Sequence, residues 1–168
     1  MIVALVALAV FAPMAAEAVV SRRHERALRA AGAIEPAGDV YRVMQAAYPA
    51  AFLLMIAEGC WRGASTGGAL AGGAVLFAAA KILKYWAIET LGVRWTFRVL
   101  VPPGSHRIGS GPYRWLRHPN YVAVFGELVG TACMTRALVA GPLATLGFTA
   151  LMLARTRVES RAIRVERR

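Results

Sequence analysis

The sequence predicts an all-α integral membrane bundle of about five transmembrane helices. Of the 168 residues, 58% are hydrophobic, the mean hydropathy is +0.50, and the apolar residues fall in separate blocks. A helix needs about 20 apolar residues to cross the hydrocarbon core of a bilayer, and most of the blocks have about that length. The total length predicts a single domain over residues 1–168.

Five segments are candidates for spanning helices: residues 2–20, 43–61, 67–90, 119–135 and 138–154. The first has its arginines after the apolar run and none before it, so we expect a retained helix rather than a cleaved signal peptide. The glycines of the third predict a helix-packing surface. The fourth is short, and only Arg136 and Ala137 separate it from the fifth, which predicts a tight helical hairpin.

The net charge of +11 follows a membrane pattern rather than that of a nucleic-acid-binding protein. With the N-terminus outside and alternating helices, all of the 20 Lys and Arg residues except Arg62 and Arg136 lie on the cytoplasmic side. We therefore expect a multi-pass protein of the cell inner (plasma) membrane that contacts membrane lipids and no nucleic acid. The outer connections are too short for a site, so we expect the active site to face the cytoplasm.

The two cysteines, Cys60 and Cys133, both lie in apolar segments. Their spacing fits neither a metal site nor a disulfide framework, so we interpret them as packing residues. No cluster of side chains in the sequence requires a metal ion.

A polar loop, residues 92–118, joins the third and fourth segments. Its Pro102-Pro103-Gly104 and Gly109-Ser110-Gly111-Pro112 stretches break any helix. One interpretation is a folded pocket wall, because irregular backbone at membrane depth requires protein or a water-filled cavity beside it. The other is a solvated basic linker against anionic headgroups. Tyr113 and Trp115 offer apolar faces to a flat ligand.

The fourth segment begins with His118-Pro119-Asn120-Tyr121. Proline suits the first turn of a helix, where its missing N–H is not needed. The N–H groups of Asn120 and Tyr121, together with the helix dipole, predict an anion site. Alternatively, His118 is an ordinary hydrogen-bonding residue at the membrane interface.

Glu127 lies about 12 Å along the fourth helix from Pro119, at a rise of about 1.5 Å per residue. A carboxylate at that depth is costly and should face the bundle interior, on the same helix face as Asn120. Two roles remain open: a base that removes a proton from an acceptor hydroxyl, or a structural hydrogen bond to a neighbouring helix.

Other charged residues carry weaker signals. Glu89 shares a helical stripe with Lys81 and Tyr85, which predicts a row that neutralises itself. Glu17 and Glu58 are interpreted as ordinary pairing residues near helix ends.

In the tail, Arg155 and Glu159 are four residues apart and therefore share one helix face. This spacing is consistent with a pair of ligand-binding side chains. Spacing alone is more typical of a surface ion pair at the end of a helix.

Four motifs in this order resemble the isoprenylcysteine carboxyl methyltransferase family of integral membrane methyltransferases. The motifs are Leu91-Gly92…Arg94-Trp95, Gly111-Pro112-Tyr113-Arg114, Arg117-His118-Pro119-Asn120-Tyr121 and Arg155…Glu159. The resemblance covers about residues 84–163, as a family-like catalytic core. It implies that S-adenosylmethionine binds in a cytoplasmic pocket formed by the loop, the next helix and the tail. A lipophilic small-molecule acceptor is then expected to enter from the bilayer.

The same resemblance implies residue roles. The implied cofactor-binding residues are Arg98, Ser105, His106, Arg107, Ile108, Tyr113, His118, Pro119, Asn120, Tyr121 and Glu159. Arg155 is expected to face the acceptor, and Glu127 to act as a catalytic base. Two positions depart from the family: Ser160, not a second acidic residue, follows Glu159, and Glu127 replaces an apolar or aromatic residue.

The HPNYVAVFGELVG stretch and the basic segment after the first helix resemble one bacterial branch of the family. Members of this branch are associated with type III polyketide synthases and O-methylate alkylpyrones or alkylresorcinols. Transfer of a methyl group to such an oxygen is therefore the expected reaction. The alternatives are carboxyl methylation of a prenylcysteine-like substrate, N-methylation of a phospholipid, and a non-catalytic transport or scaffold subunit.

Overall fold

The computed structural model describes residues 1–36, 38, 40–104 and 108–165, of which 158–165 are described by their backbone only. Within that part of the chain there is no strand, only an isolated bridge between Ile34 and Val101. The predicted all-α class is therefore confirmed. The elements are α1 (Ile2–Ala30), α2 (Tyr41–Arg62), α3 (Gly67–Leu91), the short 3₁₀ helices η1 (Gly92–Arg94) and η2 (Gly111–Arg114), α4 (Pro119–Thr135) and α5 (Ala140–Val165).

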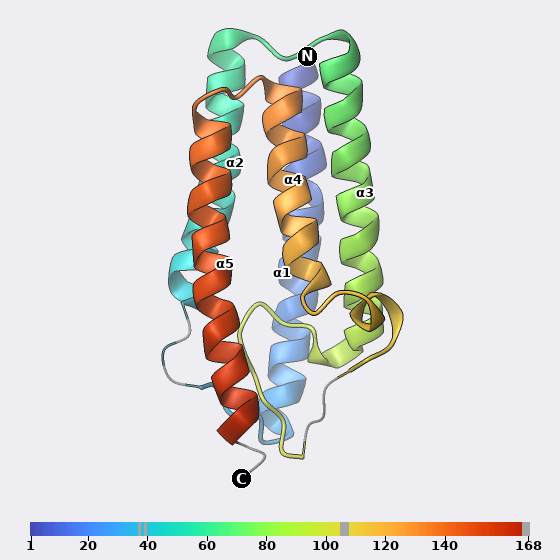
Figure 1. Ribbon diagram of the computed structural model, residues 1–168, viewed down its shortest axis with the longest axis vertical. Helices are drawn as coiled ribbons and strands as arrows, with labels where there is room; N and C mark the ends of the chain where they lie inside the picture. Colours follow the sequence, from blue (N-terminus) through green and yellow to red (C-terminus); the bar gives the residue numbers. More distant parts are fainter. Residues whose placement is uncertain (37, 39, 105–107, 166–168) are drawn as a thin grey trace.

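The five long helices run alternately up and down in one bundle (Figure 1). The N-terminus and the two short turns, α2–α3 and α4–α5, lie at one end, which we call the turn end. The α1–α2 connector, the described parts of the α3–α4 loop and the C-terminal end of α5 lie at the other, which we call the loop end. The segments that the sequence predicts on one side of a membrane therefore meet at one end of the molecule.

Three segments are long and apolar enough to cross a membrane: α1, α2 and residues Gly67–Arg94. Only 17–28% of the most apolar window in each is buried inside the protein, so most of these apolar side chains face outward. Leu8, Leu54 and Ile82 are examples, each at least 60% exposed. An apolar outer surface of this kind suits contact with lipid rather than with water. The bundle is a helical membrane fold, as predicted.

Helix α4 is short because the other helices surround it. It has 17 residues, or about 25 Å of helix, and ten of them are buried. It contacts all four of the other long helices. A helix enclosed by protein on most sides does not need the length or apolarity of one that faces lipid.

Small residues bring α3 and α4 into close contact. A Cβ atom on Gly73 would lie 2.8 Å from the carbonyl oxygen of Gly130, and one on Gly130 would lie 2.9 Å from that of Gly73. One turn further on, Gly126 faces Ala80 in the same way. This confirms the packing surface predicted for the third segment. Gly72, in contrast, has nothing within 4 Å of its would-be side chain and faces outward.

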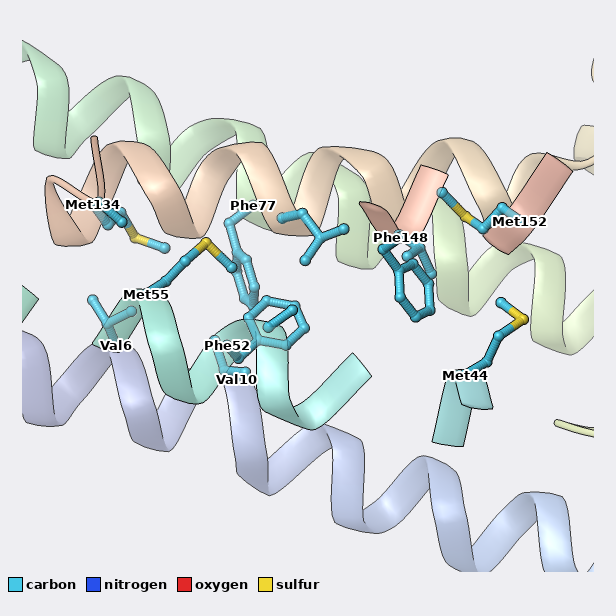
Figure 2. Packing of buried hydrophobic residues seen from close by; sticks show 13 residues of the cluster. Val6, Val10, Met44, Phe52, Met55, Phe77, Met134, Phe148 and Met152 are labelled. Atoms are coloured by element: carbon cyan, nitrogen blue, oxygen red, sulfur yellow. The ribbon is translucent and has the colours of Figure 1, made fainter. Parts of the chain in front are cut away.

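The hydrophobic core runs along the bundle axis and draws on all five helices (Figure 2). Towards the turn end it is filled by Val6, Phe52, Met55, Phe77 and Met134, among others. Towards the loop end the core continues in three large side chains, Met44, Phe148 and Met152.

Several helix ends differ from the sequence-based expectation. Helix α1 continues past residue 20 to Ala30, and α5 continues past residue 154 to Val165. Hydropathy marks only the part of a helix that matches the bilayer, whereas Arg, Ala, Leu and Glu extend the helix beyond it. The α4–α5 hairpin is tight, as predicted, and Arg136 ends α4 in the left-handed conformation with φ of 54°.

Two smaller predictions are resolved at the turn end. Glu58 is a pairing residue, as predicted: it contacts Arg62 at 2.7 Å and also accepts the N–H groups of Val139 and Ala140 at the start of α5. The two cysteines, interpreted as packing residues, are not buried inside the bundle. Cys60 and Cys133 are exposed free thiols, because apolar segments of a membrane bundle have an outward face that composition alone does not distinguish.

Candidate active site

A cavity of about 720 Å³ opens at the loop end of the bundle. Its walls come from α1, the first turns of α2, the second half of α3, residues 94–102 of the loop, the start of α4 and the inner face of α5. Binding sites for small molecules have volumes of about 300–1,000 Å³, so this cavity has room for a cofactor-sized ligand. It combines polar groups from the loop with apolar side chains such as Val124, Phe148 and Met152.

The loop is a folded wall of this cavity and not a solvated linker. Trp95 is 3% exposed, and its backbone carbonyl oxygen lies 2.8 Å from His24 Nδ1 on α1. The N–H of Phe97 donates to Ser21 Oγ at 2.9 Å. Because α1 extends beyond the apolar segment, its last turns provide the polar groups to which the loop is attached.

A second attachment joins the loop to the α1–α2 connector. Ile34 and Val101 exchange two backbone hydrogen bonds of 3.0 Å. Beside them, the carboxylate of Glu35 contacts Arg98 at 2.7 Å and Arg29 at 2.6 Å. We call this group of contacts the latch. It fixes the strip from Arg98 to Val101, which lines the cavity.

The latch shifts the pKa values of its members. Burial alone would raise the pKa of Glu35, but hydrogen bonds from Arg29 and Arg98 outweigh it, so this pKa lies below its usual value of 4.5. The pKa of Arg98 is raised, mainly by its hydrogen bond to Glu35. Arg98 also lies over the ring of Tyr41, with 4.4 Å between guanidinium and ring centre. Both groups are therefore charged at neutral pH, and Arg98 combines cavity lining with attachment of the loop.

The start of α4 forms another part of the wall. His118 and Tyr121 line the cavity and their rings stack with centres 5.2 Å apart. Pro119 is buried in the first turn of the helix and does not line the cavity. The predicted anion site is wrong for Tyr121, because its N–H donates to the carbonyl oxygen of His118 at 3.0 Å in a tightened first turn.

Asn120 presents an unsatisfied polar atom to the cavity. Its side-chain oxygen Oδ1 is buried and has no hydrogen-bond partner among the residues that the structure describes. Buried polar atoms are normally hydrogen-bonded, and leaving one unpaired costs about 1–3 kcal/mol. Since Asn120 lines the cavity, a ligand with an N–H or O–H donor would satisfy it.

The remaining predicted site residues divide into three groups. Ile108, Tyr113 and Arg155 line the cavity, and Arg155 is 8% exposed with its Nη1 atom 3.9 Å from Met44 Sδ. Trp115 does not line the cavity: it is 68% exposed and packs on Trp86, so the prediction that it faces a ligand is wrong. The third group of predicted site residues, whose side chains lie outside the described part of the chain, is Ser105, His106, Arg107 and Glu159.

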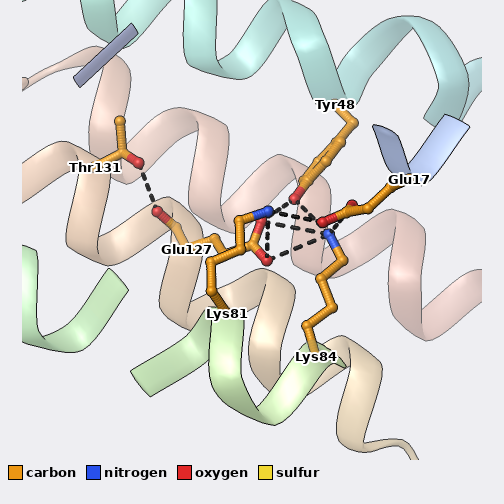
Figure 3. Close-up of polar contacts among 6 residues, drawn as sticks. All are labelled: Glu17, Tyr48, Lys81, Lys84, Glu127 and Thr131. Atoms are coloured by element: carbon orange, nitrogen blue, oxygen red, sulfur yellow. Dashed lines mark hydrogen bonds and ion pairs between the residues drawn. The ribbon is translucent and has the colours of Figure 1, made fainter. Parts of the chain in front are cut away.

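At the deep end of the cavity lies a cluster of charged and polar side chains from four helices (Figure 3). We call it the charge cluster; it consists of Glu17 (α1), Tyr48 (α2), Lys81 and Lys84 (α3) and Glu127 (α4). The four ionised groups are each at most 9% exposed, and two lysines balance two carboxylates. Buried charges are tolerated only when they are paired in this way.

The contacts within the charge cluster are symmetric for the lysines but not for the carboxylates. Lys81 and Lys84 each contact both Glu17 and Glu127, at distances from 2.7 to 3.3 Å. Only Glu127 also accepts a hydrogen bond from the hydroxyl of Tyr48. Glu127 faces the bundle interior as predicted and is 1% exposed, but it does not line the cavity. Tyr48 and Lys84 do.

The sequence-based interpretation missed most of this cluster. It grouped Lys81 with Glu89, but Glu89 is exposed, and Lys81 pairs with Glu17 instead. A signal was present, because α1 and α3 both start at the turn end and rise about 1.5 Å per residue. Glu17 therefore lies about 22 Å along α1 and Lys81 about 21 Å along α3, at matching depth.

The structure defines the class of protein: a helical membrane bundle with a polar, ligand-sized cavity at one end. Residues 73–165 match the family model of the isoprenylcysteine carboxyl methyltransferase (ICMT) family. The chain is also 32% identical over 149 residues to the uncharacterized protein YpbQ of Bacillus subtilis (strain 168), and the alignment covers 89% of each chain. No solved structure matches the chain. The chain therefore belongs to the isoprenylcysteine carboxyl methyltransferase family, a family of membrane methyltransferases.

Proposed function

We propose that this protein transfers a methyl group from S-adenosylmethionine to an oxygen of a lipophilic acceptor that enters from the bilayer. The observation that carries the proposal is the 720 Å³ cavity, which joins the polar loop to the apolar interior of a membrane bundle. Family members are methyltransferases that use S-adenosylmethionine. When bound, this cofactor supplies an already activated methyl group on a sulfonium, so the protein mainly has to orient the reactants and exclude water.

The cavity residues fit this cofactor. Asn120 Oδ1 is a buried acceptor without a partner among the described residues, and the cofactor carries amino groups that donate hydrogen bonds. Ile108, Tyr113 and the stacked pair His118–Tyr121 offer flat or apolar surfaces for an aromatic base. We therefore propose that the loop and the start of α4 hold the cofactor, with Glu159 contributing from the tail.

The charge of the cavity wall supports an acidic acceptor. Among the lining residues that the structure describes, six are cationic and one, Glu25, is anionic. The cations are Arg22, Lys84, Arg94, Arg98, Arg117 and Arg155, of which Lys84 and Arg98 contact carboxylates. A wall of this sign attracts an ionised oxygen acid and repels an amine. It therefore favours an enol, a phenol or a carboxylate as acceptor over the headgroup amine of a phospholipid.

Among such acceptors we propose an alkylpyrone, an alkylresorcinol or a similar enol or phenol, as in the bacterial branch that the sequence resembles. The second candidate is the carboxylate of a prenylcysteine-like substrate, which the family membership also supports. The specific observation behind it is Arg155, whose buried guanidinium lines the cavity and has the shape to clamp a carboxylate.

The first test is calorimetric binding of S-adenosylhomocysteine to the detergent-purified protein. We expect one saturable site in the wild type. Asn120→Ala should weaken binding about tenfold, the loss of about one hydrogen bond, and Glu159→Ala should also weaken it. Leu146→Ala, on the lipid-facing surface, is the matched control and should bind normally. A folded wild type without binding would overturn the proposal and favour the transport or scaffold alternative.

We further propose that the loop end faces the cytoplasm of the inner (plasma) membrane, because the basic loop and tail gather there. The test uses a variant with Cys60 and Cys133 replaced by serine and one new cysteine at Leu138 or at Arg114, which are exposed at opposite ends. A membrane-impermeant maleimide added to intact cells should label the Leu138→Cys protein and not the Arg114→Cys protein. Labelling of the Arg114→Cys protein and not of the Leu138→Cys protein would show that the loop end faces outward, against the proposal.

A further inference from the structure

At the deep end of the cavity, a hydroxyl group forms the wall and a carboxylate lies directly behind it. Tyr48 lines the cavity from α2, and its hydroxyl donates a hydrogen bond to Glu127, which lies behind it and outside the cavity. Lys84, which also lines the cavity, donates to the same Tyr48 oxygen at 3.3 Å. Any ligand oxygen that reaches this end therefore meets Tyr48 and Lys84 before it meets Glu127.

We propose that Tyr48 is a catalytic residue that relays a proton from a weakly acidic hydroxyl acceptor, an enol or a phenol, to Glu127. The proposal rests on the proposed methyl-transfer function and narrows its acceptor to this chemical class. Phenols ionise near pH 10, so at neutral pH their oxygen needs help in losing its proton before it attacks a methyl group. A carboxylate acceptor is already ionised and needs no such group.

The chemical step balances within the observed contacts. The acceptor O–H proton moves to Tyr48 Oη while the proton of Tyr48 moves to Glu127 Oε2. Bound S-adenosylmethionine would supply the methyl carbon for the new bond to the acceptor oxygen, and the electron pair of the broken carbon–sulfur bond would stay on sulfur. The loss of the sulfonium's positive charge would then balance the loss of the negative charge of the Glu127 carboxylate, so the total charge would be unchanged.

The surroundings of Tyr48 suit this role. A phenol oxygen has one proton to donate and two lone pairs to accept with. The proton is directed to Glu127 and one lone pair to Lys84, which leaves a second lone pair for an acceptor hydroxyl in the cavity. The Lys84 ammonium favours any negative charge that forms on either oxygen during the transfer.

The alternative is that Tyr48 only completes the charge cluster. The chain offers matched variants that separate the two roles, because Glu17 and Glu127 have the same lysine partners but only Glu127 accepts from Tyr48. A structural role predicts equal effects of Glu17→Gln and Glu127→Gln. The proton relay predicts a rate loss specific to Glu127→Gln and Tyr48→Phe.

The experiment measures single-turnover methylation of three long-chain probes: an alkylphenol, its more acidic nitro-substituted analogue and a fatty acid. We expect Tyr48→Phe to lower the rate on the alkylphenol by about 10²-fold or more, the size of a general-base contribution. The rate on the nitrophenol, which ionises unaided, should fall by less than about tenfold. Glu127→Gln should follow Tyr48→Phe, whereas Glu17→Gln should not.

The pH profile gives a readout that a structural role would not move. The groups that face Tyr48 and Glu127 are Glu17 from α1 and Lys81 and Lys84 from α3. In the wild type the alkylphenol rate should reach a plateau well below pH 10. In Tyr48→Phe it should keep rising with pH towards about 10, because the acceptor itself must then ionise in solution.

The outcomes distinguish the two proposals. Equal rate losses on phenol and nitrophenol, an unchanged pH profile, or turnover of the fatty acid alone would overturn the proton relay while methyl transfer stands. A wild type that binds no S-adenosylhomocysteine and methylates none of the probes would overturn the proposed function. If Tyr48→Phe does not fold, as judged by its binding of S-adenosylhomocysteine, the comparison of Glu127→Gln with Glu17→Gln decides alone.

Discussion

The two halves of this bundle use opposite packing strategies. Towards the turn end, α3 and α4 meet through Gly73 and Gly130, where an added Cβ would lie under 3 Å from backbone. Towards the loop end, α2 and α5 face each other through large side chains such as Tyr48, Phe148 and Met152, which border the cavity. Small residues let two helix backbones come into direct contact, whereas large side chains hold the backbones apart and line the cavity between them.

The charge cluster lies where the packed half gives way to the hollow half. Thr131 and Thr135, on the packed side of Glu127, satisfy their hydroxyls on α4 carbonyl oxygens one turn before them, at 2.8 Å. Tyr48, on the hollow side, instead directs its hydroxyl to another helix. The two threonine hydroxyls therefore stay within α4, whereas the Tyr48 hydroxyl at the boundary joins α2 to α4.

The largest effect should follow from removing one charge at this boundary. Lys84→Met leaves Glu17 and Glu127 with a single lysine between them, and an uncompensated buried charge costs about 3–5 kcal/mol. We expect a corresponding loss in unfolding free energy, measured by denaturant titration in detergent. The double variant Lys84→Met/Glu17→Gln restores the charge balance and should regain part of the loss. A loss below about 1 kcal/mol for Lys84→Met would contradict the paired arrangement.

The second prediction breaks the seam of the packed half. Gly130→Val forces side-chain carbons against the backbone of Gly73 and Phe77, and overpacking of this kind costs about 1–3 kcal/mol. Thermal unfolding in detergent should show the loss as a lower midpoint. The matched control is Gly72→Val on the outward face of α3, where nothing lies within 4 Å. Equal midpoints for the two variants would show that α3 and α4 are not in close contact.

The third prediction adds bulk to the same helix in the hollow half. Val124 lies on α4 and lines the cavity, so the larger ring of Val124→Phe has space to extend into the cavity. We expect a stability change within about 1.5 kcal/mol, in contrast to Gly130→Val. The KM for a long-chain phenol acceptor should rise about tenfold, since one lost apolar contact region is worth about 1–3 kcal/mol. An unchanged KM would place the acceptor elsewhere.

The sequence predicts the apolar elements of this fold better than its polar ones. Continuous runs of about 20 apolar residues locate the helices, and the glycines of α3 correctly predict a close contact with another helix. The start of α4 follows from Pro119, because proline fits a first helical turn. The prediction of a family-like pocket likewise depends on local motifs, and most of the described residues named for it line one cavity.

The partners of the charged residues could not be predicted in the same way. The spacing of Lys81 and Lys84 fixes how they lie on α3, but the rotation and depth of α1 and α4 decide that Glu17 and Glu127 meet them. Tyr48 carries no sequence signal, since a tyrosine in an apolar helix is typical of ordinary packing. Such contacts between helices require the assembled bundle.

The smallest predicted effect concerns how the hollow half is closed. At the turn end Glu58 holds the start of α5 through backbone N–H groups, whereas at the loop end Glu35 holds the loop through Arg98. The pKa of Glu35 lies below its usual 4.5, so its contribution is complete above that value and is lost as pH falls through the lowered pKa. The contribution should be about 1 kcal/mol or less, because the side chain is partly exposed.

The measurement is acrylamide quenching of a variant that keeps Trp95 as its only tryptophan, because this loop residue is 3% exposed. At pH 7, Glu35→Gln should increase quenching slightly relative to the parent, since the amide pairs less strongly with Arg98. Once the pH falls below the lowered pKa of Glu35 the two proteins should converge, because the parent then carries a neutral Glu35 as well. Glu89→Gln, at an exposed position outside the latch, should match the parent at every pH. A difference between Glu35→Gln and its parent that persists at low pH would mean that the shape of the Glu35 side chain, rather than its charge, holds the loop against the cavity.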